Sequence, residues 1–104
     1  MRENQAVNLL RMKPIDLSKP PDLSDSLIIE GDALYALKSL PDRSVRCAIT
    51  SPPYWGLRDY GIQRQIGLES TLSEFIAHLV EIFSEVKRVL SDDGTLWLNI
   101  GDGY

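Results

Sequence analysis

The feature that most constrains the fold is an alternation of short apolar runs with stretches of helical periodicity. The runs have the length of buried strands, and each is followed by residues typical of turns: 27–30, 45–50 and 95–100. An order of strand, helix, strand, helix, strand favours right-handed crossovers and a parallel sheet. We therefore predict an α/β fold in which three parallel strands are joined by crossover helices.

Leucine spacing and one strong start signal predict the two helices. A short helix between the first two strands is indicated by Leu34, Leu37 and Leu40. The second helix is predicted to begin at Thr71, where Glu74 completes a capping box, and to end at the Asp-Asp-Gly of residues 92–94. Its apolar residues recur at three- and four-residue steps and form one stripe that must pack on a sheet: Leu72, Phe75, Ile76, Leu79, Ile82, Phe83, Val86, Val89 and Leu90.

The chain divides into an N-terminal arm and a folded part. The first residues lack both periodicities and include Lys19-Pro20-Pro21-Asp22, so residues 1–26 are predicted to be an arm or linker and residues 27–104 a partial catalytic domain. Open α/β sheets usually have about twice as many strands as the three predicted here. The sequence also ends directly after the third strand. We therefore expect an incomplete domain, either a truncated gene product or one piece of a larger protein.

Composition excludes several classes of protein. The 104 residues make at most one small domain, and 43% hydrophobic with 25% charged residues is the balance of a soluble globular protein. No apolar run could span a bilayer or form a signal peptide, so we expect no membrane association and a cytoplasmic location. The 11 Lys and Arg against 15 Asp and Glu argue against a self-sufficient nucleic-acid binder. A single cysteine, Cys47, excludes an internal disulfide, and we expect it to be a small buried hydrophobe.

Ser51-Pro52-Pro53-Tyr54, which follows the second predicted strand, is the most informative segment. In open parallel sheets, ligands bind beyond the carboxyl ends of the strands. Two successive prolines hold the preceding residues extended and have no N–H, so the turn presents oxygen acceptors without competing donors. Tyr54 adds a flat aromatic face. Such a corner suits a planar group that carries an NH₂, although a plain strand-ending turn or a polyproline ligand has the same residues.

These four residues resemble motif IV of the DNA amino-methyltransferases, in which Asp, Asn or Ser precedes Pro-Pro and an aromatic residue. Further segments recur in the same order in members that methylate cytosine N4 or adenine N6: 28–34, 40–45 and 94–102. The resemblance covers residues 27–104 and implies a partial Rossmann-like methyltransferase fold. The family's glycine-rich Phe-x-Gly-x-Gly turn is missing from the sequence. Because only 49 residues precede Thr50, the motif order resembles the permuted beta group, in which that turn comes later.

The resemblance implies transfer of a methyl group from S-adenosylmethionine to the exocyclic amine of a base flipped out of double-stranded DNA. Ser51 and the Pro52 carbonyl would accept hydrogen bonds from the target NH₂ and concentrate its lone pair. Pro53 would keep the turn rigid, and Tyr54 would stack on the base. Serine before Pro-Pro favours cytosine N4 over adenine N6. Cytosine C5 chemistry is excluded, because in that family a cysteine nucleophile follows a proline, and Cys47 lies inside a predicted strand.

The same resemblance assigns other residues, each beside a plainer interpretation. Asp32 ends the first strand where the family places an acceptor near the adenine of S-adenosylmethionine, and it is equally a helix N-cap. His78 is interpreted as structural, while Asn99 and Asp102 either line the cleft or form a turn. The loop after the corner is a candidate DNA contact or an ordinary surface loop, and its candidate DNA-binding residues are Trp55, Arg58, Tyr60 and Arg64.

Three functional hypotheses follow. The first is the catalytic-motif part of a beta-group DNA amino-methyltransferase, which requires a missing C-terminal portion in cis or in trans. The second is a methyltransferase that acts on an RNA or a protein amide, since such enzymes use a similar Asn-Pro-Pro-Tyr turn. The third is a non-catalytic remnant or interaction module that forms a homodimer through an uncovered sheet edge.

Overall fold

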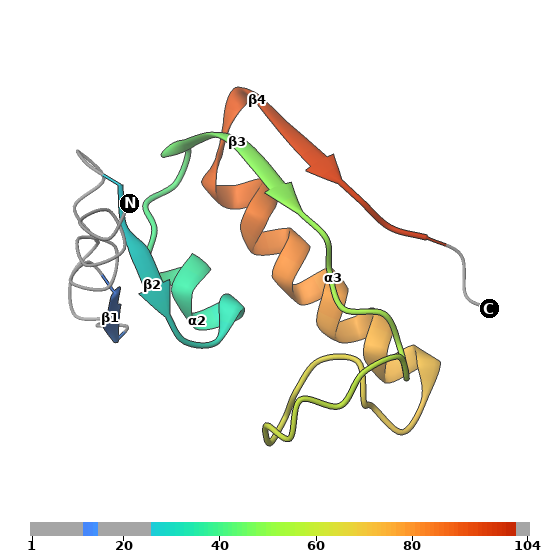
Figure 1. Cartoon of the computed structure of the whole chain (residues 1–104). Helices are drawn as coiled ribbons and strands as arrows, with labels where there is room; N and C mark the ends of the chain where they lie inside the picture. The colour runs from blue at the N-terminus through green and yellow to red at the C-terminus, as the bar shows by residue number, and fades with distance from the viewer. Residues whose placement is uncertain (1–11, 15–25, 102–104) are drawn as a thin grey trace.

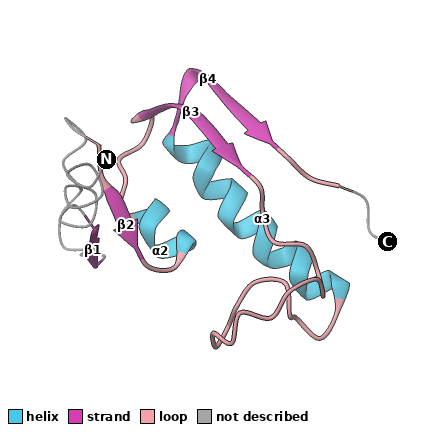
Figure 2. Ribbon diagram, in the orientation of Figure 1, coloured by secondary structure: helices cyan, strands magenta, loops and turns pink. Residues whose placement is uncertain are grey.

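The computed structural model describes residues 12–14 and 26–101 of the chain (Figures 1 and 2). Strands and helices alternate after the first strand, as the sequence predicts. The elements are β1 (Met12–Pro14), β2 (Ile28–Glu30), α2 (Ala33–Lys38), β3 (Val45–Thr50), α3 (Leu72–Val89) and β4 (Leu90–Leu98). The predicted arm lies outside the described residues except for residue 26 and for β1, a strand that was not predicted from the sequence.

The strands form two small parallel sheets. β1 pairs with β2, and β3 pairs with β4 in a register that places Ile49 beside Trp97. The fold is therefore α/β with parallel pairing, but the predicted single sheet of three strands is not confirmed in the described residues. Apolar runs indicate that strands are parallel without saying which are neighbours, and consecutive strands are adjacent only in roughly two-thirds of cases.

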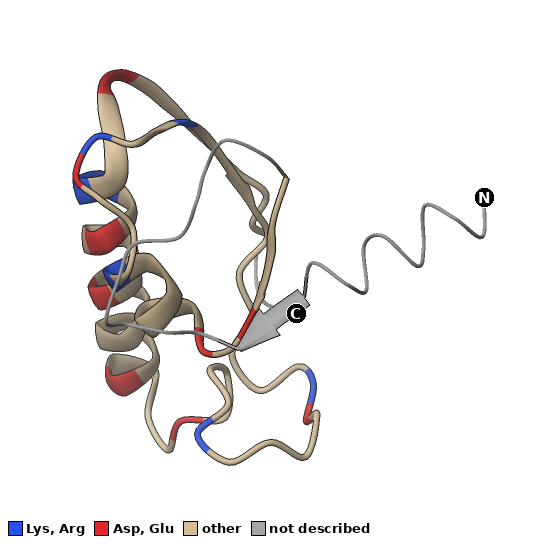
Figure 3. Cartoon of the chain, turned by 90° about the vertical axis from the view of Figure 1, so that its left-hand side faces the viewer, with Lys and Arg blue, Asp and Glu red and all other residues tan. Residues whose placement is uncertain are grey.

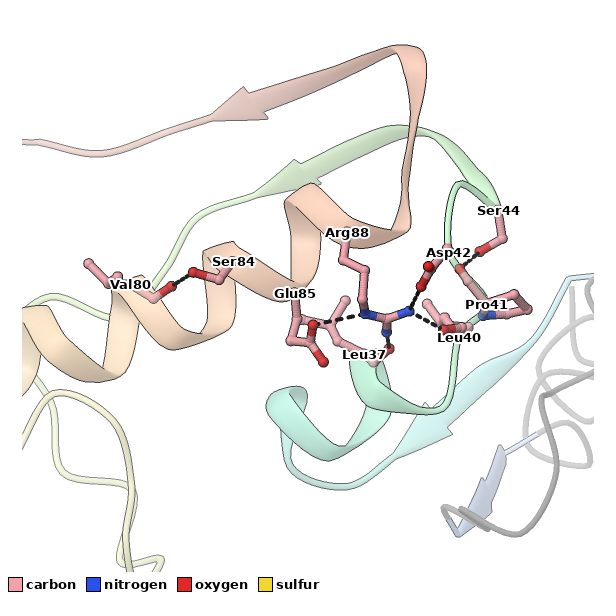
Figure 4. A network of polar contacts seen from close by, with 9 residues as sticks. All are labelled: Leu37, Leu40, Pro41, Asp42, Ser44, Val80, Ser84, Glu85 and Arg88. Carbon is pink, nitrogen blue, oxygen red and sulfur yellow. Dashed lines mark hydrogen bonds and ion pairs between the residues drawn. The ribbon is translucent and has the colours of Figure 1, made fainter.

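Helix α2 is short and is fixed at both ends by side chains. At its start, the Asp32 carboxylate accepts hydrogen bonds from the backbone N–H groups of Leu34 and Tyr35. At its end, Arg88 of α3 donates to the carbonyl oxygens of Leu37 and Leu40 (Figure 4). The Leu37 carbonyl also accepts a hydrogen bond from the backbone N–H of Leu40, so Arg88 adds a second donor there and ties α2 to α3.

Helix α3 begins where the sequence predicts and ends earlier. Thr71 is its N-cap, and both hydrogen bonds of the capping box with Glu74 are present, which confirms that prediction. The predicted end at residues 92–94 is wrong, because Leu90 already has extended backbone and begins β4. The buried side chains of the helix are four of the nine in the predicted stripe: Phe75, Leu79, Val86 and Val89. No helix in the described part of the chain combines the length and the apolar composition that crossing a membrane requires.

The β3–β4 sheet has α3 on one face only (Figure 1). Leu96 of β4 lines a cavity together with Phe83 and Val86 of α3, so this face carries the core. Side chains alternate along a strand, and the neighbouring Ile49 and Trp97 point to the other face, where 80% and 65% of their surface is exposed.

Cys47 lies on the same uncovered face as Ile49, two residues before it along β3. It is exposed, so the prediction that it is buried is wrong. Val45, Cys47 and Ile49 share one face of β3, whereas Arg46, Ala48 and Thr50 share the other. The apolar pattern favours burial of the first face. It does not show that this face is left uncovered in this part of the chain.

Candidate functional site

The corner that follows β3 is held in place by its neighbours on both sides. The backbone N–H of Asn99 donates to the Thr50 carbonyl at 3.0 Å, which extends the β3–β4 pairing to the start of the corner. Pro52 is buried, while Ser51 and Pro53 on either side of it are exposed. The corner is thus anchored by one proline and presents the residues around it to solvent.

Two oxygen atoms of the corner are potential hydrogen-bond acceptors. Within residues 26–101, no hydrogen bond reaches the Ser51 hydroxyl or the Pro52 carbonyl. Neither proline has a backbone N–H, so these two residues offer acceptors and no donor. Ser51 and Pro52 therefore each keep one oxygen without a hydrogen-bond partner among the described residues.

Tyr54 is half-buried and is fixed at its hydroxyl end. Its phenolic oxygen accepts a hydrogen bond of 2.9 Å from the backbone N–H of Gly101, which follows β4. A cavity of about 310 Å³ opens beside the ring, and its lining residues are Ser51, Pro52, Pro53, Tyr54, Leu57, Arg58 and Tyr60. The corner and the tip of the next loop therefore share one pocket.

The loop from Trp55 to Glu69 is closed at its base. The backbone N–H of Gly56 donates to the carbonyl of Gly67 at 2.6 Å, and the indole N–H of Trp55 donates to the carbonyl of Glu69 at 2.9 Å. Gly67 has φ of +112°, and a Cβ there would lie 2.9 Å from the Tyr54 carbonyl oxygen. Only glycine allows this close approach. We call the four residues that pair across the base of the loop the neck: Trp55, Gly56, Gly67 and Glu69.

The structure separates the candidate DNA-binding residues into groups. Arg58 and Tyr60 line the pocket with the corner, and both are exposed. Trp55 is not among the residues that line the pocket, because its indole is held at the neck. Arg64 lies in a different and larger cavity of about 780 Å³, which has residues of α2, α3 and the loop in its walls.

Asp32 lines that larger cavity and caps α2. Oδ1 accepts both capping hydrogen bonds, which confirms the plainer of the two sequence interpretations. Oδ2 has no hydrogen-bond partner among the described residues, so one acceptor of Asp32 is free there. Contact with S-adenosylmethionine stays a prediction. Asn99 contributes its backbone to β-pairing, and Asp102 lies outside the described residues.

Sequence analysis missed Glu69, whose side chain is only 5% exposed. Oε2 accepts a hydrogen bond from the backbone N–H of Gly67, and Oε1 lies 2.9 Å from Nδ1 of His78. Burial works against ionisation of Glu69, but hydrogen bonds from His78 and from the backbone outweigh it and lower the pKa below its usual 4.5. The available signal was a single carboxylate between the apolar residues of the loop and the helix cap.

His78 is exposed rather than part of the apolar stripe. The hydrogen bond with Glu69 raises its pKa above the usual 6.5, against a smaller effect of desolvation and with help from the charges of Glu81 and Glu74. Both shifts favour the charged forms of the pair. The interpretation of His78 as a structural residue agrees with this contact.

Charges of both signs occur close together along α3 and along the loop (Figure 3). Of the candidate DNA contacts, only Arg58 and Arg64 are cationic, and they lie in different cavities. Duplex DNA carries one negative charge per about 1.7 Å, so two arginines neutralise a small part of any binding footprint. Strong binding of a duplex would therefore need basic residues beyond these two.

Comparison with known proteins identifies the family of this chain. Residues 45–104, more than half of the chain, match the family model described as DNA methylase. The chain therefore belongs to the DNA methylase family. The matched segment includes the corner, the loop, α3 and β4. No solved structure shows a significant match.

Curated relatives give the same result at high identity. The chain is 57% identical over 104 residues to the Type II methyltransferase M.Cfr9I of Citrobacter freundii and covers 35% of that protein. It is 67% identical over 86 residues to M.XycI of Xanthomonas campestris pv. cyanopsidis, which is 83% of this chain and 29% of the relative. Over 83 residues, 80% of this chain and 28% of the relative, it is 53% identical to M.SmaI of Serratia marcescens. The chain thus spans 28–35% of the length of these relatives.

Proposed function

We propose that this chain is the part of a Type II DNA methyltransferase that binds the amine to be methylated. The reaction is transfer of a methyl group to an exocyclic amine of a base in double-stranded DNA, with cytosine N4 preferred over adenine N6. The observation that carries the proposal is the corner at residues 51–54, which has two free acceptor oxygens and an aromatic ring around one pocket in a chain of this family.

The chemistry follows from the target. The lone pair of an exocyclic amine is delocalised into the ring, so the nitrogen is a poor nucleophile until its geometry becomes more tetrahedral. The Ser51 hydroxyl and the Pro52 carbonyl accept the two N–H bonds and concentrate the lone pair on the open side of the nitrogen. No strong base is needed, because the N–H becomes acidic as the new bond forms.

The pocket suits a base that has left the helical stack. Tyr54 stacks on the flipped base, and Pro53 keeps the corner rigid beneath it. Arg58 and Tyr60 contact the flanking phosphate and sugar, since they line the same pocket and are exposed. Trp55 shapes the neck, and Arg64 reaches the backbone farther from the target.

The described residues fit S-adenosylmethionine only in part. Asp32 offers a free carboxylate oxygen at the carboxyl end of β2, which suits a hydroxyl or amino donor of the cofactor. The glycine-rich turn for its methionine end is not in the sequence. When bound, S-adenosylmethionine supplies an electrophilic methyl group; the rest of its site must come from further sequence.

The partner that completes the enzyme is therefore the missing C-terminal portion, in cis or in trans. Parallel sheets are stable when both faces are covered, and one face of the β3–β4 sheet carries the exposed pair Ile49 and Trp97. In the complete Rossmann-like domain, β2, β3 and β4 belong to one parallel sheet, and this face is covered. Homodimerisation through an uncovered sheet edge is the competing outcome.

The decisive experiment is mass analysis of nucleosides from DNA treated with the completed enzyme. We expect N4-methylcytosine, and Tyr54→Ala should remove most methyl transfer while leaving the affinity for S-adenosylmethionine nearly unchanged. Val80→Ala, which truncates an exposed side chain of α3 that lines neither the pocket at the corner nor the larger cavity beside Asp32, is the control and should keep normal turnover. Equal turnover in the two variants would eliminate Tyr54 as the stacking residue.

Calorimetry with S-adenosylmethionine tests the completed site. The 104-residue chain alone should give little heat, and the mixture with the remaining portion should bind. If the mixture also gives no heat, and the chain sediments as a dimer, the chain is an interaction module and the enzymatic proposal is wrong. Methylated RNA or protein without methylated DNA would point to the alternative substrate classes.

A further inference from the structure

Glu69 is a buried carboxylate that the proposed chemistry does not use. Its three acceptor oxygens receive hydrogen bonds from three places: Oε1 from His78 of α3, Oε2 from the backbone of Gly67, and the main-chain oxygen from the indole of Trp55. Each bond is 2.9 Å long. One residue therefore joins both sides of the neck to α3.

The neck in turn determines where the corner lies. Gly67 lies against the carbonyl of Tyr54 so closely that an added Cβ would be 2.9 Å from its oxygen. The carbonyl of Gly67 also accepts a hydrogen bond of 2.6 Å from Gly56, two residues after Tyr54. A displacement of Gly67 therefore moves the last residue of the corner and the start of the loop together.

We propose that Glu69 is a positioning residue for the corner: held by His78, its carboxylate fixes Gly67 beneath the Tyr54 carbonyl and so aligns residues 51–54 with the loop that carries Arg58 and Tyr60. The role rests on the proposed function and makes it more specific. Glu69 does not line the pocket beside the corner and does not touch the base. Its effect passes through Gly67 and Trp55.

The hydrogen bond between Glu69 and His78 favours the charged form of each group. The hydrogen bond to Glu69 is the largest influence on His78 and raises its pKa. Charge-assisted hydrogen bonds are stronger than neutral ones, so an ionic pair holds the neck more firmly than a neutral pair would. Other titratable or charged groups line the cavity that His78 and Glu69 share: Glu74 and Glu81 of α3, Tyr35 and Lys38 of α2, Asp32 at its start, and Arg64 of the loop.

The structural half of the inference is tested on the 104-residue chain by NMR. His78 is the single histidine, so its titration is unambiguous. In Glu69→Gln, which has one side-chain acceptor oxygen instead of two, the pKa of His78 should fall. Hydrogen exchange of the Trp55 indole and the Gly67 amide should accelerate about fivefold, the factor for one net hydrogen bond. The exposed indole N–H of Trp97, which donates to the Thr95 hydroxyl, is the internal reference.

Glu81→Gln is the matched control. It removes an equal charge near His78 from the exposed surface of α3, with no hydrogen bond to the neck. It should lower the pKa of His78 slightly and leave the exchange of Trp55 and Gly67 unchanged. If Glu69→Gln lowers the pKa of His78 but the neck exchanges at the rate of the wild type, the ion pair positions nothing and the inference is wrong.

The catalytic half needs the completed enzyme. A misplacement of about 1 Å at a reacting centre can reduce the rate by about a hundredfold, so Glu69→Gln should lower kcat at least about tenfold and leave the affinity for S-adenosylmethionine within about twofold. Glu81→Gln should keep normal kcat. Faster exchange at the neck with unchanged kcat would overturn the positioning role. A wild-type enzyme that methylates no DNA would overturn the proposed function, and the NMR experiment would then show on its own whether Glu69 holds the neck in place.

A second variant covers the case in which Glu69→Gln does not fold. His78→Ala alters an exposed side chain and removes only the link to α3. It should accelerate hydrogen exchange at the neck by less than Glu69→Gln does. It should also lower kcat by less than Glu69→Gln does. Exchange and kcat equal to those of the wild type would overturn the inference on their own.

Discussion

Replacing Arg88 by alanine removes the side chain that joins α2 to α3. The guanidinium makes four hydrogen bonds: Nε to Glu85, Nη1 to the Leu40 carbonyl and to Asp42, and Nη2 to the Leu37 carbonyl (Figure 4). The side chain is 30% exposed, so part of this arrangement is shielded from water. Its loss leaves two carbonyls at the end of α2 without a side-chain donor.

The magnitude follows from the partners. Each bond to a helix-end carbonyl contributes about 1 kcal/mol to the free energy of unfolding. The Glu85 pair, three residues away on the same helix, contributes about 0.5 kcal/mol. Asp42 is mostly exposed, so its pair adds about 0.5 kcal/mol. Arg88→Ala should therefore destabilise the chain by about 3 kcal/mol. Lysine at this position should recover about 1 kcal/mol, because a single ammonium cannot span all the acceptors.

Urea denaturation and native-state hydrogen exchange measure the effect. The free energy of unfolding should fall, and the amides of α2 should lose more protection than those at the start of α3. Lys87→Ala is the control, because it removes an exposed charge from the same helical turn and should change stability by less than about 0.5 kcal/mol. An Arg88→Ala variant no less stable than Lys87→Ala would refute the view that this side chain fastens α2.

Three further predictions concern the neck and the helix start. Gly67→Ala should destabilise by about 2 kcal/mol because positive φ and a backbone oxygen both oppose a Cβ, whereas Gly61→Ala, at φ of +71° in open space, should cost about 1 kcal/mol in urea denaturation; equal costs would contradict the close approach. Thr71→Ala should lower stability by about 1 kcal/mol and expose the first amides of α3 to exchange, and unchanged protection there would mean that the cap is dispensable. For the Glu69 and His78 pair, the pKa of the carboxyl is lowered and that of the imidazole is raised, so the pair stabilises the fold fully between about pH 4.5 and 6.5. This stabilisation is lost as pH falls through the lowered pKa of Glu69 or rises through the raised pKa of His78. The difference in Tm between wild type and His78→Asn should therefore shrink as the pH is raised from 6 to 9, and a constant difference would show that the charge is irrelevant.

The predictions that succeeded depend on local chemistry. β3 lies at residues 45–50, as the apolar run indicated, and α3 starts at Thr71 because a capping box uses only groups within one turn. The end of α3 was predicted too late because Leu90 continues the apolar stripe of the helix while its backbone is already that of a strand. Periodicity cannot separate the last residue of a helix from the first of a strand when both are apolar.

The predictions that failed or were absent depend on contacts far apart in the chain. Which strands are neighbours, and which face of β3 is covered, are not encoded in the run itself, so the single sheet and the burial of Cys47 were not confirmed. Glu69 was missed because its role depends on a backbone amide two residues before it and on His78 two helical turns into α3. The corner at residues 51–54 was found because consecutive prolines restrict the backbone by themselves.

That restriction has a thermodynamic consequence. Pro52 and Pro53 have little torsional freedom even in the unfolded chain, so the corner loses less entropy on ordering than four ordinary residues would. Under the proposed function, the acceptors are therefore already in their final places before a base arrives. The DNA makes the large movement, and discrimination between bases depends on which of them can be extruded and fitted against a template that does not adapt.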